Sequence, residues 1–271
     1  MTDTPVLSGS TAIKEMDAGT LTPRSPRTVY IVLPAFNEEA NMLPLLGSLR
    51  DAMEDGVLRY QVIVVDDGSR DRTAALVEGC GREMPLTLIR HAANQGLGTT
   101  IRDGITAAVA RAGDRDIIIT MDADDTHTPG LIQRMTRMIS EGHDVVIASR
   151  YQPGSQVYGV PLTRRLMSGG ASLLMRVVFP IRGVRDYTCG FRAYRAVALR
   201  AAVSRYGDDF VNQKGFQCMV DILLRLRSMN LVFGEVPFVL RYDRKGGQSK
   251  MRVWTTAWHT LSLLARRRIG L

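Results

Sequence analysis

The chain has 271 residues, of which 45% are hydrophobic and 23% charged, and its formal net charge is +8 at pH 7. This composition is that of a globular protein and excludes a chain that is disordered throughout. The three cysteines are widely spaced and form no CxxC pair, which excludes a disulfide scaffold and argues against structural zinc. Neither a secretory signal nor a membrane-spanning run of about 20 apolar residues is recognised, so we expect a cytoplasmic protein.

The positive charge is concentrated at one end of the chain. Residues 241–271 contain eight basic residues and one acidic residue, a net charge of +7, so the preceding 240 residues are nearly neutral. A cationic end of this kind attracts phosphate groups, which nucleic acid, anionic lipid or a phosphorylated substrate would supply.

The predicted elements alternate through the first half of the chain. Residues 1–26 are rich in Ser, Thr, Pro and Gly and are expected to form a mobile tail. Short β-branched runs then alternate with segments of helical spacing. The predicted strands cover 28–33, 61–65, 86–90, 116–121 and 144–148, and the predicted helices cover 38–53, 70–79, 97–112 and 129–140. This order predicts an α/β fold with a mostly parallel sheet flanked by helices.

The pattern is less regular after residue 150. We expect helices at 164–179, 215–229 and 251–268, and strands within 186–194 and 231–240. In parallel sheets ligands bind beyond the carboxyl ends of the strands, so the residues that follow each predicted strand are the candidates for chemistry.

The strongest candidate is the acidic run Asp122-Ala123-Asp124-Asp125, directly after a hydrophobic strand. In an extended segment alternate residues point to the same side, so Asp122 and Asp124 can share one divalent cation. Mg²⁺ commonly takes one or two protein carboxylates and completes its shell with water and substrate phosphates. The alternative is a set of solvated loop acids or a helix cap.

Two further strand ends carry polar residues. Asp66-Asp67-Gly68-Ser69 offers a carboxylate for a base or a ribose, and an ordinary Asp-Gly turn explains it equally well. Residues 34–38 (PAFNE) are compatible with both a capped helix start and a ligand loop. The P-loop pattern is absent, and Gly96-Leu97-Gly98 lacks the third glycine of a dinucleotide fingerprint.

Seven motifs in order carry a family resemblance. PAFNEE (34–39), VVDDGSRDRT (64–73), NQGLG (94–98), MDADD (121–125) and SRY (149–151) resemble the family 2 glycosyltransferases, which have the GT-A fold. DYTCGFRAYR (186–195) and RKGGQSK (244–250) resemble the polyprenyl-phosphate glycosyltransferases, above all the dolichol-phosphate mannosyltransferases. The resemblance covers roughly residues 28–253.

The resemblance implies three groups of site residues. The catalytic group is Asp122, Asp124 and Arg150. The nucleotide-sugar site comprises Pro34, Ala35, Asn37, Glu38, Asp66, Asp67, Gly96, Asp122, Ala123, Asp124 and Arg150. The cations expected at the acceptor phosphate are Arg164, Arg165, Arg192, Arg244 and Lys250.

The metal would be Mg²⁺ or Mn²⁺, held by Asp122 and Asp124. Many relatives have a glutamine two residues after the second metal aspartate, where this chain has Thr126. The further ligand would then be Asp125 or Thr126. The implied division is a nucleotide-sugar half at 27–150 and an acceptor half at 151–250, which together form the catalytic domain.

The expected reaction is metal-dependent, inverting transfer of a sugar to a polyprenyl or dolichyl phosphate. Mannose from GDP-mannose leads, with UDP-glucose and UDP-N-acetylglucosamine as alternative donors. A phosphate monoester is largely dianionic at pH 7 and needs no general base, so cations rather than a spare carboxylate should dominate the acceptor side. The rival functions are transfer to a hydroxyl acceptor and a non-catalytic module that binds lipid or nucleic acid.

The final predicted helix, at 251–268, bears on the acceptor. Trp254, Trp258 and Leu261 recur at helical spacing, and Arg266 to Arg268 follow. This pattern is typical of a basic amphipathic helix on an anionic membrane surface, and a helix docked on the core explains it equally well. We therefore expect a protein peripheral on the cytoplasmic face, anchored by itself, by a partner or as a homo-oligomer, with no nucleic-acid partner.

Overall fold

The computed structural model describes residues 27–56 and 58–244. The predicted tail at 1–26 and the predicted helix at 251–268 lie outside these residues. Within the described ranges no helix is both long and apolar enough to cross a membrane.

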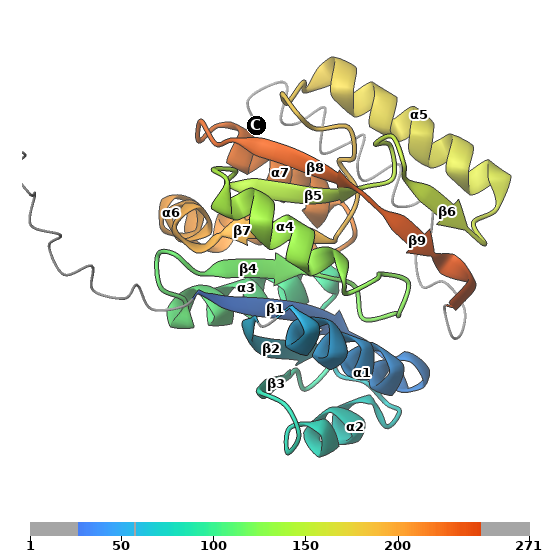
Figure 1. Ribbon diagram of the computed structural model, residues 1–271, viewed down its shortest axis with the longest axis vertical. Coiled ribbons are helices and arrows are strands. Elements are labelled where there is room, and N and C mark those ends of the chain that lie inside the picture. Colours follow the sequence, from blue (N-terminus) through green and yellow to red (C-terminus); the bar gives the residue numbers. More distant parts are fainter. Residues whose placement is uncertain (1–26, 57, 245–271) are drawn as a thin grey trace, which may run out of the picture.

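One seven-stranded sheet organises the chain (Figure 1), in the order β3-β2-β1-β4-β7-β5-β8. Strand β7 runs antiparallel to β4 and β5, and the remaining neighbours are parallel. The prediction of a mostly parallel sheet is therefore confirmed. The strands are β1 (Thr28–Ala35), β2 (Arg59–Asp66), β3 (Leu86–Arg90), β4 (Ile117–Thr120), β5 (Val145–Ser149), β7 (Arg192–Arg195) and β8 (Phe233–Pro237).

Helices cover both faces of the sheet (Figure 1). Helix α3 contacts β1, β2 and β4 as well as α6 and α7, while α4 packs on β5, β7 and β8. The central strands are buried on both faces, which explains their continuous Val and Ile runs. The helices are α1 (Glu39–Asp55), α2 (Thr73–Cys80), α3 (Leu97–Arg111), α4 (Leu131–Ser140), α5 (Leu162–Val178), α6 (Ala196–Tyr206) and α7 (Cys218–Arg227).

A second, two-stranded sheet corrects the prediction of one strand at 231–240. The chain leaves the main sheet at Phe238, whose N–H donates to the carbonyl of Ser149 at 3.2 Å. It then forms β9 (Val239–Arg241), which pairs in parallel with β6 (Gln156–Tyr158). The 3₁₀ helix η2 (Tyr242–Arg244) follows at once, and an earlier one, η1 (Gly207–Val211), follows α6. Neither strand β6 nor helix α6 was among the elements predicted from the sequence.

Candidate active site

The acidic loop after β4 is held in place by a buried histidine. The main-chain N–H of Asp122 points at Nδ1 of His127 at 3.3 Å, and His127 Nε2 lies 3.6 Å from Asp122 Oδ2. The His127 ring is buried and stacks on Phe191 with 5.2 Å between ring centroids. The Asp122 side chain remains 38% exposed. The loop therefore presents the Asp122 carboxylate to solvent from a rigid base.

Thr126, which stands where the family pattern has a glutamine, contacts the second aspartate of the loop. The buried Thr126 donates its hydroxyl to Asp124 Oδ1 at 2.6 Å, and its carbonyl accepts the N–H of Arg241 at 3.0 Å. Thr126 thus orients the second predicted metal carboxylate and ties the loop to β9. Ala123, between the two aspartates, is buried.

Asp125, the last acid of this loop, interacts with Arg244, one of the cations predicted at the acceptor phosphate. Its φ is +56°, a left-handed conformation that is uncommon outside glycine. Burial raises the pKa of its carboxyl, while the positive charge of Arg244 opposes the rise and the negative charge of Asp124 adds to it. Arg244 lies at the end of η2, three residues beyond Arg241, whose N–H donates to the Thr126 carbonyl of the acidic loop.

The donor set fits a hard divalent cation. Asp122 and Asp124 supply oxygen ligands, and Mg²⁺ or Mn²⁺ can complete its shell with water and diphosphate oxygens. Among residues 27–56 and 58–244, no three His, Cys, Asp or Glu side chains converge as a complete protein cage.

A cavity of about 870 Å³ opens beside the ends of β1, β2 and β3. The predicted residue Asn37 lines it, with φ +52° and its Oδ1 accepting the N–H of Arg70 at 2.8 Å. Pro34 and Ala35 form the end of β1 below it. The lining residues are Phe36, Asn37, Gly68, Ser69, Arg70, Arg90, His91, Ala92, Ala93 and Asn94.

Three predicted carboxylates around this cavity are engaged in shaping its loops. Glu38 is buried and accepts from Asn41 at 2.6 Å. Asp66 is buried and accepts the N–H of Ser69 at 3.1 Å. Asp67 accepts the main-chain N–H groups that precede α3, including that of Gly96 at 2.9 Å.

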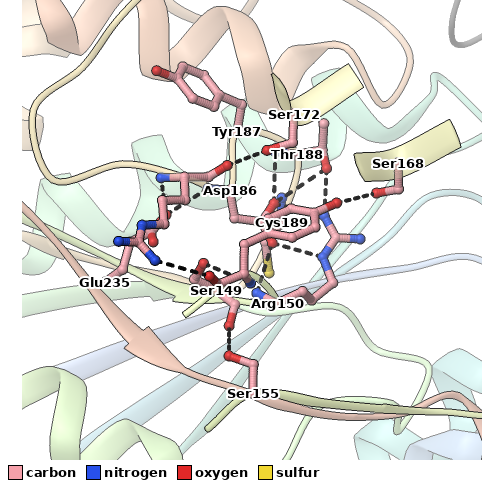
Figure 2. A network of polar contacts seen from close by, with 12 residues as sticks. Ser149, Arg150, Ser155, Ser168, Ser172, Asp186, Tyr187, Thr188, Cys189 and Glu235 are labelled. Atoms are coloured by element: carbon pink, nitrogen blue, oxygen red, sulfur yellow. Dashed lines mark hydrogen bonds and ion pairs between the residues drawn. The ribbon is translucent and has the colours of Figure 1, made fainter. Parts of the chain in front are cut away.

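Arg150 lies in a buried polar network (Figure 2). Its Nε and one terminal nitrogen contact the two oxygens of Asp186 at 2.8 and 2.7 Å. Asp186 is fully buried and also accepts the N–H groups of Thr188 and Cys189. Burial alone would raise the pKa of the Asp186 carboxyl, but the charge and hydrogen bonds of Arg150 outweigh it and lower the pKa. Burial likewise opposes the charge on Arg150, and Asp186 more than restores it, so the pKa of Arg150 is raised.

The same network fixes the loop that faces the acidic run. Glu235 accepts the N–H groups of Arg185 and Asp186, both at 2.6 Å (Figure 2). A few residues on, a Cβ at Gly190 would lie 2.8 Å from Asp122 Oδ1. Only glycine allows the backbone to approach that carboxylate so closely. Asp186, Gly190, Glu235 and His127 were not among the predicted site residues, although the first two lie in the motif quoted for 186–195.

Arg192 does not lie where the prediction needs it. The side chain is 0% exposed, and its terminal nitrogens donate to the carbonyls of Tyr187 and Met219 at 2.8 and 2.7 Å. A guanidinium enclosed in this way supports the chain around β7 and is not presented to an incoming phosphate. The structure therefore removes Arg192 from the acceptor group.

The remaining predicted cations are distributed as follows. Arg165 is exposed on α5, and Arg244 is exposed beside the acidic loop. The side chain of Arg164 and the whole of Lys250 lie outside the described residues. The structure thus brings one cation of the predicted acceptor group, Arg244, to the acidic loop.

A family model identified as "Glycosyl transferase family 2" matches residues 30–202. The chain belongs to glycosyl transferase family 2. It is a glycosyltransferase with the GT-A fold, as its motifs predicted.

Three curated proteins are 29–32% identical to the chain over the aligned residues. A "Dolichol-phosphate mannosyltransferase" of Pyrococcus furiosus is 31% identical over 83% of this chain, and the match spans 59% of that protein. An "Undecaprenyl-phosphate mannosyltransferase" of Micrococcus luteus is 32% identical over 82% of this chain and 87% of its own length. A "Polyprenol monophosphomannose synthase" of Mycolicibacterium smegmatis is 29% identical over 85% of this chain and 83% of its own length.

Solved structures agree on the fold. The glucosyl-3-phosphoglycerate synthase of Mycobacterium tuberculosis, crystallised with Mn²⁺, UDP and phosphoglyceric acid, superposes with a TM-score of 0.65. It covers 90% of this chain and 79% of its own length at 19% identity. The same enzyme was also crystallised with Mg²⁺ and UDP, with a TM-score of 0.64. At this level of identity the likeness establishes the fold alone.

Proposed function

We propose that the protein transfers mannose from GDP-mannose to a polyprenyl phosphate, in a reaction that needs Mg²⁺ or Mn²⁺ and inverts the anomeric carbon. The identity of 31–32% to two lipid-phosphate mannosyltransferases over more than four-fifths of the chain carries the proposal. The crystals of the mycobacterial fold neighbour with Mn²⁺ or Mg²⁺ support the use of a divalent ion.

The donor would occupy the strand ends. The nucleoside would lie in the cavity lined by Asn37 and Ser69, and the diphosphate would reach the loop at Asp122 and Asp124. These two carboxylates would hold the metal, which when bound neutralises charge on the leaving diphosphate. Thr126 would keep Asp124 oriented, so in this proposal it supports a ligand and Asp125 stays near the acceptor.

The acceptor phosphate would approach from the β9 side. A phosphate monoester is already largely dianionic at pH 7 and attacks without a general base. Arg244 is exposed beside the acidic loop and would hold this phosphate, with Arg164, Arg165 and Lys250 as further proposed contacts. Arg150 would act as a positioning residue through Asp186. The proposed boundary between donor and acceptor halves stays at residue 150.

Parallel donors test this proposal. GDP-mannose, UDP-glucose and UDP-N-acetylglucosamine, each labelled in the sugar, are offered with detergent-dispersed undecaprenyl phosphate, with Mg²⁺, Mn²⁺ or EDTA. We expect label in the organic phase from GDP-mannose only, and none with EDTA. Label from a UDP-sugar instead would show that the donor is a UDP-sugar and not GDP-mannose. The UDP complexes of the mycobacterial fold neighbour favour a UDP-sugar as the second candidate donor.

Helix α5 supports the proposed membrane surface. Leu162, Leu173 and Val177 are 68%, 59% and 73% exposed, far more than apolar side chains within the core. Residues 151–185, which include α5, carry five arginines and no acidic residue. Apolar side chains on a helix with surrounding cations suit an interface with anionic lipid. We therefore propose a protein peripheral on the cytoplasmic face, with α5 and the predicted helix at 251–268 as its contacts. An anchoring partner or a homo-oligomer would add to the attachment.

Placing negative charge on the exposed apolar surface of α5 should separate membrane attachment from catalysis. In Leu173→Glu/Val177→Glu we expect flotation with anionic vesicles to fall several-fold, because two carboxylates enter the apolar surface. Turnover of detergent-dispersed acceptor should stay within about twofold. Val197→Glu on α6, where Val197 is 42% exposed, is the matched control and should float like the wild type. Equal flotation of both variants would contradict a lipid contact at α5.

A further inference from the structure

One imidazole joins three elements around the proposed nucleotide cavity. His91, directly after β3, places Nδ1 2.8 Å from Asp67 Oδ1 and Nε2 3.1 Å from Asp103 Oδ2. Asp67 follows β2 and Asp103 lies on α3. The side chains of His91 and Asp67 are only 6% and 5% exposed, whereas that of Asp103 is 34% exposed. The ring therefore runs from the cavity wall to a partly solvated carboxylate on α3.

Three groups contact the Asp67 carboxylate. Its Oδ1 accepts the N–H of Gln95 at 2.8 Å as well as the His91 contact, and its Oδ2 accepts the N–H of Gly96 at 2.9 Å. Hydrogen bonds to a charged acceptor are short and strong, and a buried carboxylate that loses a partner is costly. The orientation of Asp67 and the course of the loop before α3 thus depend on each other and on His91.

Each nitrogen of the His91 ring has its own carboxylate partner. Both of its nitrogens face carboxylate oxygens, and both contacts are hydrogen bonds only when both nitrogens bear hydrogen. The charged groups around the ring are Asp67 and Asp103, with Arg102 3.1 Å from Asp103 on the same helix and Arg90 at the end of β3. A neutral amide or an apolar side chain at position 91 cannot bridge the two carboxylates in this way.

The two loops joined by the contact between His91 and Asp67 also touch each other directly. Gly68 and Ala93, on opposite loops, are in such close contact that a Cβ at Gly68 would lie 2.7 Å from the carbonyl carbon of Ala93. Both residues line the cavity, as does His91. The loops after β2 and β3 therefore pack directly against each other at the cavity.

We propose that His91 is a positioning residue for nucleotide binding, which holds Asp67 and the loop before α3 in the arrangement that receives the nucleoside. This inference rests on the proposed donor site. It differs from a purely structural role because His91 is expected to act through Asp67, so its removal should matter only while the Asp67 carboxylate is present.

A double-mutant cycle on nucleotide affinity tests the inference. The dissociation constant of GDP with Mn²⁺ is measured by calorimetry for the wild type, His91→Ala, Asp67→Asn and the double variant. We expect each single change to weaken binding on the order of tenfold, because a hydrogen bond to a charged group is lost. The double variant should be no weaker than the weaker single variant. Asp103→Asn should weaken binding less, because it leaves the contact between His91 and Asp67 in place.

The outcomes are distinct. His143→Gln is the control, since within the described residues the His143 ring is hydrogen-bonded to the Met138 carbonyl, at 3.1 Å, and His143 lies between α4 and β5 and does not line the cavity. The inference would be overturned if His91→Ala bound GDP as tightly as the wild type does. It would also be overturned if the fold-losses of the two single variants multiplied in the double variant. Either result would leave the proposed function standing. A wild type that binds neither GDP nor UDP would overturn both.

Discussion

Replacing Asp124 by alanine should abolish measurable transfer, with a loss on the order of 10²–10³-fold or more. The comparable cost is that of deleting one group that stabilises developing charge in a transition state. In addition, Thr126 would lose the carboxylate to which its hydroxyl donates at 2.6 Å. The measurement is initial-rate transfer with saturating donor and Mn²⁺.

Metal dependence gives this prediction a second readout. Binding of Mn²⁺ in the presence of GDP, followed by electron paramagnetic resonance, should be lost in Asp124→Ala while the far-ultraviolet circular dichroism spectrum is kept. Asp55→Ala is the matched control, because Asp55 is an exposed carboxylate at the C-terminal end of α1. A variant that keeps Mn²⁺ binding and turnover would show that Asp124 is not a metal ligand.

Replacing Asp186 by alanine should cost the fold about 3–5 kcal/mol, the usual effect of removing one partner of a buried ion pair. Asp186 is fully buried, and Arg150 would lose both of its close carboxylate contacts. The melting temperature should fall by roughly 10 °C. Transfer should also fall, because the loop that brings Gly190 against Asp122 would lose its anchor. Asp114→Asn removes an exposed ion-pair carboxylate and should change stability by less than about 1 kcal/mol.

Acidification gives an independent test of the same pair. The pKa of Asp186 is lowered in the folded state, so its ionisation stabilises the protein above its ordinary pKa of about 4. That contribution is lost as the pH falls through the folded-state value. The difference in unfolding free energy between the wild type and Asp186→Asn, from urea titrations, should therefore shrink below about pH 4. A difference that stays constant through this range would contradict the ion pair as the source of stability.

The first half of the fold was predictable because one physical pattern repeats there. Buried parallel strands require apolar runs on both faces, and such runs are visible at 28–33 and 144–148. The polar residues that follow each strand then lie at one edge of the sheet, so Asp122, Asp66 and Asn37 can be assigned to the same edge without any knowledge of distant contacts.

The second half was less predictable because its elements depend on long-range contacts. Strand β7 inserts antiparallel between β4 and β5, and the chain changes sheets at Phe238 through a bond to Ser149. Helix α6 begins directly at the end of β7, in an alanine-rich segment with few large apolar residues to mark a helical face.

Two site residues show the same limit at the scale of side chains. The arginine in a phosphate-site motif was expected to bind a ligand, but Arg192 is closed in by carbonyls of Tyr187 and Met219. Conversely, the role of Asp186 follows from Arg150, which is 36 residues away in sequence. The residue type shows which interactions a side chain can make. Only the fold shows which partner it contacts.

The acceptor atom is the central claim, and a matched pair of lipids tests it most directly. Labelled GDP-mannose is offered with undecaprenyl phosphate or with undecaprenol, at equal concentration in the same detergent, and label in the organic phase is counted. We predict transfer to the phosphate, lost with EDTA and in Asp124→Ala, and none to the alcohol. The account would be contradicted by equal transfer to the alcohol, or by donor turnover that never labels the lipid phosphate.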